Sequence, residues 1–108
     1  MPREDRRVIF DMSETYQALY KLSTKQDGEG KLIAGAIVKI EESADDPNKI
    51  QFFLENPQIN EKKTVTYTRD FVAAALMMYC RGVGIPLARK ASKSIIIEKD
   101  RVTLRSMV

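Results

Sequence analysis

Histidine and tryptophan are both absent from this chain of 108 residues, and cysteine occurs once. Without histidine the chain lacks the commonest general base at neutral pH and the commonest metal ligand. A Ser-His-Asp triad, a Cys-His pair and a histidine-based zinc site are therefore excluded within one copy. The single cysteine, Cys80, excludes an intrachain disulfide, and its place in an apolar stretch indicates an inert, buried thiol.

The sequence also shows neither a long apolar run nor the pattern expected of a secretory leader. The longest uncharged stretch, residues 71–80, is far shorter than the roughly 20 apolar residues that a membrane-spanning helix needs. The first ten residues, MPREDRRVIF, are charged and lack the apolar segment of a signal peptide. We therefore expect a cytoplasmic protein that does not cross a membrane.

Motifs for phosphate, metal or cofactor binding are also lacking. The glycine pair at residues 82–84 follows a predicted helix, whereas a phosphate loop needs the backbone N–H groups at a helix N-terminus. The pair at residues 28–30 precedes a predicted strand and indicates a turn. The acidic segment at residues 41–46 does not have the ligand spacing of a calcium loop. We predict a protein that is not an enzyme and that uses no cofactor and no metal.

What the chain does contain is typical of one globular domain. Hydrophobic residues make up 44% and charged residues 31%, which is neither a disordered nor a fibrous composition. Residues 1–108 are predicted to form a single domain, in which residues 1–6 are a flexible N-terminal arm. No internal repeat or linker divides the chain.

Apolar periodicity and turn residues predict the element order β-α-β-β-β-α-β-β. Strands are expected at residues 7–11, 32–40, 50–55, 63–67, 94–97 and 101–107. Ser13 is the predicted N-cap of a helix over residues 14–25, and Thr68 that of a second helix, which ends near Arg81 with Gly82 or Gly84 as its cap. Residues 86–92 fit a short helix and an extended turn equally well. The short polar links favour antiparallel pairing, so the fold class is α+β, with two helices packed on a mainly antiparallel sheet.

The second helix carries the most informative side chains, because it is apolar on every side. A helix of this kind needs cover on nearly its whole circumference, and one sheet supplies only part of it. Phe71, Ala75, Met78 and Tyr79 are therefore candidate core or assembly residues. A symmetric dimer, formed through this helix or through a sheet edge, is one source of the remaining cover. A loop or the C-terminal hairpin is another.

The charge is distributed unevenly along the chain. Residues 1–61 carry 8 basic and 12 acidic side chains, a net charge of −4, whereas residues 62–108 carry 10 basic and 3 acidic, a net charge of +7. Such asymmetry is typical of an anionic partner, of two attracting faces, or of a plain solvated surface. The candidate contacts for an anionic partner are Arg81, Arg89, Lys90 and Lys93.

Together these patterns predict a small interaction or regulatory module that forms a homodimer and binds a macromolecular partner, for which a protein is the first candidate. The alternative is a nucleic-acid-binding protein that uses the basic C-terminal half. Residues 81–94 loosely resemble a helix, a turn and a basic second helix, which is the arrangement of a helix-turn-helix. Against this alternative, the second helix is short, and a hairpin follows it closely.

Overall fold

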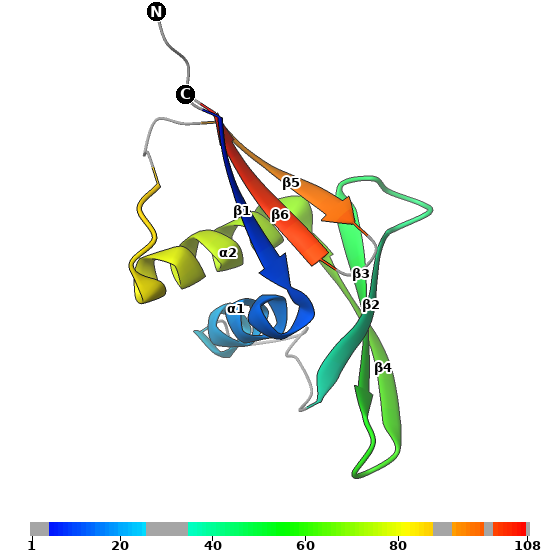
Figure 1. Ribbon diagram of the computed structural model, residues 1–108. Coiled ribbons are helices and arrows are strands. Elements are labelled where there is room, and N and C mark those ends of the chain that lie inside the picture. The colour runs from blue at the N-terminus through cyan, green and yellow to red at the C-terminus, as the bar shows by residue number, and fades with distance from the viewer. Residues whose placement is uncertain (1–4, 26–34, 88–91, 99–100, 108) are drawn as a thin grey trace, which may run out of the picture.

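The computed structural model describes residues 5–25, 35–87, 92–98 and 101–107 (Figure 1). Its element order, β-α-β-β-β-α-β-β, confirms the predicted α+β fold. The elements are β1 (Asp5–Asp11), α1 (Met12–Lys25), β2 (Ala36–Glu42), β3 (Lys49–Asn56), β4 (Glu61–Thr68), α2 (Arg69–Val83), β5 (Ser92–Glu98) and β6 (Arg101–Met107).

The strands form two three-stranded sheets with the orders β1-β6-β5 and β2-β3-β4, and every neighbouring pair is antiparallel. In the first sheet Leu104 of β6 lies between Val8 and Ile95. The first and last strands of the chain are therefore neighbours. The division into two sheets is not indicated by the sequence, because local periodicity does not say which strands pair.

The start of α1 differs from the prediction, and Ser13 as its N-cap is wrong. The Asp11 carboxylate accepts a hydrogen bond of 2.8 Å from the backbone N–H of Glu14. The Glu14 carboxylate in turn accepts one of 3.1 Å from the N–H of Asp11. This reciprocal pair is a capping box, which satisfies two backbone donors that the first turn leaves free. Asp11, and not Ser13, is the N-cap because Asp11 is followed three residues later by a glutamate that completes the capping box.

Both ends of α2 agree with the sequence. The Thr68 hydroxyl accepts a hydrogen bond of 3.1 Å from the N–H of Phe71, which confirms it as the N-cap. Gly84 ends the helix in the left-handed conformation, with φ of 83°, where glycine meets no steric penalty. The next N–H, that of Ile85, donates to the Cys80 carbonyl at 2.8 Å.

Several element boundaries differ from those predicted, most clearly at the starts of β1 and β2. Asp5 and Arg6 lie in β1 and not in an N-terminal arm. β2 begins at Ala36, and residues 32–34 of the expected strand lie outside the described residues. A register shift between Ile37 and Lys39 places a bulge in β2, which is an edge strand of its sheet.

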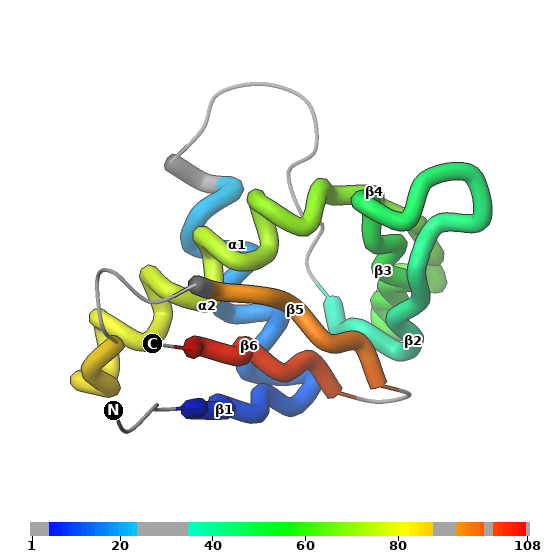
Figure 2. The backbone as a smooth tube through the Cα atoms, turned by 90° about the horizontal axis from the view of Figure 1, so that it is seen from above, coloured from blue at the N-terminus to red at the C-terminus, as the bar shows by residue number. Residues whose placement is uncertain are grey.

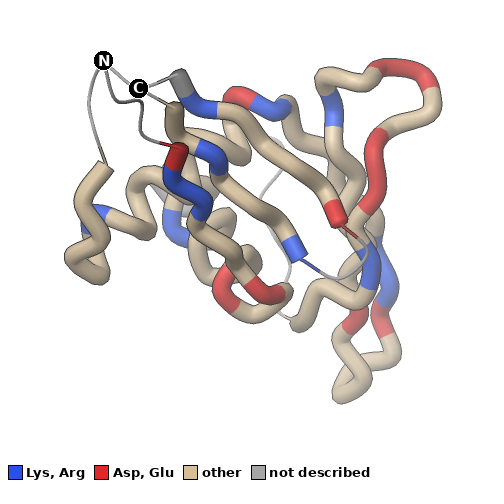
Figure 3. The backbone as a smooth tube through the Cα atoms, turned by 45° about the horizontal axis from the view of Figure 1, so that its top comes forward, with Lys and Arg blue, Asp and Glu red and all other residues tan. Residues whose placement is uncertain are grey.

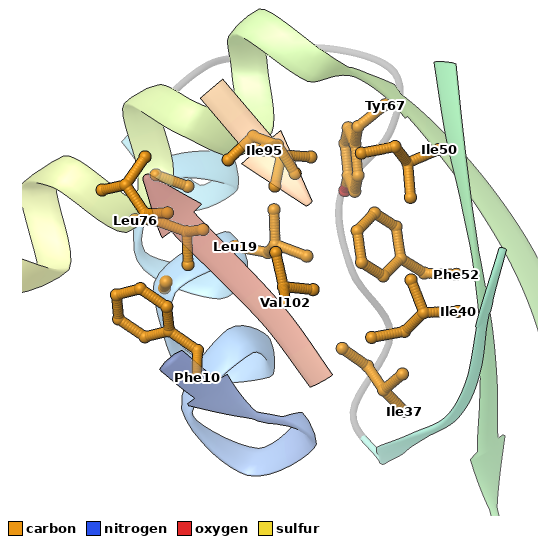
Figure 4. Packing of buried hydrophobic residues seen from close by; sticks show 14 of the residues in the cluster. Phe10, Leu19, Ile37, Ile40, Ile50, Phe52, Tyr67, Leu76, Ile95 and Val102 are labelled. Carbon is orange, nitrogen blue, oxygen red and sulfur yellow. The ribbon is translucent and has the colours of Figure 1, made fainter. Parts of the chain in front are cut away.

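The core lies where the two helices and the two sheets meet (Figure 4). α1 contacts α2, β1, β2 and β6, whereas α2 contacts β4 and β5 as well as α1. Seen from above, β1, β6 and β5 lie side by side in the first sheet, and β3 and β4 lie at one end of the molecule (Figure 2). The largest buried side chains are Phe10, Leu19, Ile50, Phe52, Leu54, Leu76 and Leu104. Each apolar side chain of this size stabilises the fold by about 1.5–3 kcal/mol when it is fully buried.

One arginine joins elements from both sheets. Arg69, the first residue of α2, donates from Nε to the Pro47 carbonyl and from Nη1 to the Ile95 carbonyl, both at 2.7 Å. Its Nη2 donates to the Glu42 carboxylate at 2.6 Å. The guanidinium therefore ties β5 to β2 and to the connection between β2 and β3. We call this arrangement the Arg69 clasp.

Candidate interaction surface at the C-terminal end of α2

A groove of about 850 Å³ lies where the end of α2, the segment that follows it and the start of β5 meet. We call it the α2–β5 groove. The apolar part of its lining comes from both sides of the Gly84 cap: Met77 precedes the cap, and Ile85, Pro86 and Leu87 follow it. Among the described residues, those that line the groove are Met77, Arg81, Gly84, Ile85, Pro86, Leu87 and Lys93.

Two of the four predicted cationic residues line this groove together. Arg81 comes from the last turn of α2, where a cation is favoured by the negative end of the helix dipole. Lys93 comes from the start of β5, twelve positions further along the chain. The other two, Arg89 and Lys90, lie outside the described residues. The structure thus combines apolar side chains and two positive charges in one concave site.

Arg6 positions the segment that forms one wall of the groove. Its Nη1 donates a hydrogen bond of 2.7 Å to the carbonyl of Pro86. The two residues are 80 positions apart, so nothing local in the sequence indicates this contact. Sequence reasoning also missed Ile85 and Leu87, although apolar residues directly after a helix cap are a signal for packing beside that helix.

The predicted assembly residues of α2 lie mostly against other parts of the same chain. Ala75 is fully buried, and Phe71 stacks on Tyr67 with ring centroids 4.5 Å apart. Tyr79 meets Phe10 edge to face at 5.8 Å. Met78 is half-buried. Contacts within the same chain therefore bury much of the apolar surface of α2.

The face of α2 that remains open is a different one. Asp70, Ala74 and Arg81 are exposed, and Met77 between them is half-buried. Their spacing of four, three and four residues places them in one line along the helix. This open face adjoins the α2–β5 groove, because Met77 and Arg81 belong to both.

Charge over the rest of the molecule is mixed in sign. Acidic residues gather in the connection between β2 and β3, and basic residues are spread over several strands and both helices (Figure 3). On the sheet formed by β1, β6 and β5, Arg105 makes two hydrogen bonds, of 3.0 and 2.8 Å, to the Asp5 carboxylate. These bonds lower the pKa of Asp5 below its ordinary value. Many basic residues are thus accompanied by acidic ones.

Other features of the described residues do not form a reactive site. Cys80 is buried, and burial raises the pKa of its thiol, which disfavours the reactive thiolate. No three acidic or cysteine side chains in the described part of the chain are placed to hold a metal ion. A second, smaller hollow of about 290 Å³ is lined mainly by apolar atoms of Met12, Tyr16 and Ile37. No helix among the described residues is long and apolar enough to cross a membrane.

Comparisons of the chain with protein-family models, with curated proteins and with solved structures found no match. The interpretation of the groove therefore depends on the geometry and chemistry of this chain alone.

Proposed function

We propose that this chain is a small, non-enzymatic intracellular interaction module, which self-associates and binds a protein partner in the α2–β5 groove. The partner segment would carry acidic and apolar side chains. The observation that supports this proposal most directly is that Arg81 and Lys93 share one groove with Met77, Ile85 and Leu87. Cytoplasmic location is part of the same proposal.

The composition of the groove determines which partner it suits. Apolar side chains gain free energy by burying other apolar surface, at about 25 cal/mol for each Å². Two cations at the same place favour a carboxylate and disfavour an ammonium or guanidinium group, so they select the partner by charge. A peptide that alternates leucine with aspartate or glutamate offers both kinds of group in one short segment.

A nucleic-acid partner is less well supported by the same features. Duplex binding needs a set of cations that follows the phosphate backbone, and most contacts to nucleic acid are to phosphate and sugar. In the described residues only Arg81 and Lys93 among the predicted contacts share a site, and its other side chains are apolar. Residues 85–87 are not helical, and β5 already begins at Ser92. The segment after α2 is therefore poorly suited to be the recognition helix of a helix-turn-helix.

Fluorescence anisotropy with a labelled peptide of alternating leucine and glutamate residues tests the groove. We expect the wild-type protein to bind it and the Lys93→Gln variant to bind several-fold more weakly, because one of the two cations is removed. Lys63→Gln is the matched control, since Lys63 is an exposed lysine in β4, outside the groove. Equal binding by the Lys93→Gln variant and the wild type contradicts the proposal.

The same measurement with a labelled DNA duplex distinguishes the two partner classes. Strong duplex binding that weakens steeply with salt and depends on Lys93, without any binding of the peptide, would replace the protein partner by a nucleic acid.

A further inference from the structure

The open face of α2 has the chemistry of a surface that pairs with itself. Asp70 lies in the first turn of the helix and Arg81 in the last, with Ala74 and Met77 between them. We call these four residues the α2 stripe. At a rise of 1.5 Å for each residue, the stripe is about 16 Å long. On an ideal helix, its members lie within an arc of about 60°.

We propose that two copies of this chain form a symmetric dimer in which their α2 stripes pack against each other in antiparallel orientation. This inference rests on the self-association named in the proposed function, and it specifies the surface and the arrangement. A two-fold axis would pass near the middle of the stripe, between Ala75 and Leu76. Asp70 of each copy would then face Arg81 of the other, and Ala74 would face Met77.

Shape and charge both favour this pairing over its alternatives. The small Ala74 leaves space for the long, flexible Met77 of the second copy, so the two helices can approach closely. A parallel arrangement would instead place Asp70 on Asp70 and Arg81 on Arg81. Like charges that face each other across an interface are unfavourable, and therefore the antiparallel arrangement is selected.

The charged ends of the stripe are available for such contacts. Within the described residues, the side chains of Asp70 and Arg81 take part in no hydrogen bond or ion pair. Each also suits the dipole of its own helix end, which is an explanation that needs no second copy. The helix dipole acts within one copy, whereas the dimer pairs Asp70 of one copy with Arg81 of the other. Only the dimer therefore makes the effect of a charge substitution on association depend on the charge carried by a second molecule.

Charge reversal and mixing test this dependence by sedimentation equilibrium. We expect the wild type to be a dimer at micromolar concentration. The Asp70→Arg and Arg81→Asp variants should each associate about ten-fold or more weakly, because each places like charges at both ends of the stripe. When the two variants are mixed in equal amounts, association should return, since every contact in the mixed dimer again joins opposite charges.

Two further variants keep the test independent of effects on folding. Ala74→Glu places a charge against Met77 of the second copy at an exposed position in mid-helix, and it should also weaken association. Gln17→Arg, at an exposed position of α1, is the control for a change of charge alone and should leave the dimer unchanged. Circular dichroism establishes that each variant is folded.

Each outcome has a distinct meaning. A wild-type dimer that mixing does not restore, or that tolerates Ala74→Glu, overturns the α2 stripe as its interface. A wild type that is monomeric at every concentration overturns self-association altogether. Arg81 and Met77 belong to both surfaces, so the groove is tested through Lys93, which lines the groove and lies outside the stripe. Peptide binding therefore tests the proposed partner site separately.

Discussion

Replacement of Arg69 by methionine removes the clasp between the two sheets but keeps most of the apolar stem of the side chain. Two of the three lost hydrogen bonds run from a charged donor to backbone carbonyls, those of Pro47 and Ile95. Hydrogen bonds to charged groups contribute about 1.5–3 kcal/mol each in buried sites. The Arg69 side chain is 26% exposed, so in the variant water can bond to part of the groups that lose the arginine, and the loss of stability is smaller than in a fully buried site.

The third bond contributes less. The Glu42 side chain is 52% exposed, and ion pairs at such sites contribute about 0–1 kcal/mol. The substitution leaves both carbonyls without the arginine, and the larger cost is expected at Ile95, whose contact is part-buried, whereas that of Pro47 is exposed. Together these contributions give an expected loss of about 2–4 kcal/mol in the free energy of unfolding for Arg69→Met.

Urea denaturation, followed by far-ultraviolet circular dichroism, measures this loss. Glu42→Gln is the matched comparison, because it removes the ion pair and keeps both bonds to the carbonyls. We expect it to cost less than about 1 kcal/mol. If Arg69→Met costs no more than Glu42→Gln, the bonds to the carbonyls do not hold the two sheets together, and the reasoning is refuted.

Three further predictions concern single positions. Gly35 has φ of 149°, and a Cβ there would lie 2.5 Å from the Glu55 carbonyl oxygen. Gly35→Ala should therefore lower the urea midpoint of unfolding. An unchanged midpoint would show that the backbone moves aside at no cost. Asp11→Ala removes the N-cap of α1 and should cost about 1 kcal/mol in the same assay; no loss would mean that Ser13 takes over the cap. Burial raises the pKa of Tyr67 above its ordinary value of 10.0, so the stability that comes from its neutral form is complete below pH 10 and is lost as the pH rises through the raised pKa. Tyr67→Phe should remove the late part of the tyrosinate absorbance titration, and an unchanged titration would contradict this.

Local signals were sufficient for most of the secondary structure. Thr68 and Gly84 mark the ends of α2, because a cap is formed by hydrogen bonds within a few residues of the chain. The hairpin of β5 and β6 is local for the same reason, since its strands are joined by a short link. Where two local signals compete, as at Asp11 and Ser13, the outcome depends on which residue has a partner at the right spacing, here Glu14.

Residue pattern by itself therefore determined the order of the helices and strands, the apolar character of α2, and the absence of histidine chemistry within one copy. Only the tertiary structure decided that β1 pairs with β6, that the strands divide into two sheets, and that Arg81 and Lys93 share a groove. The physical reason is the range of the interactions. Caps and periodicity act over a few residues, whereas the pairing of distant strands depends on how all the apolar side chains bury one another at once.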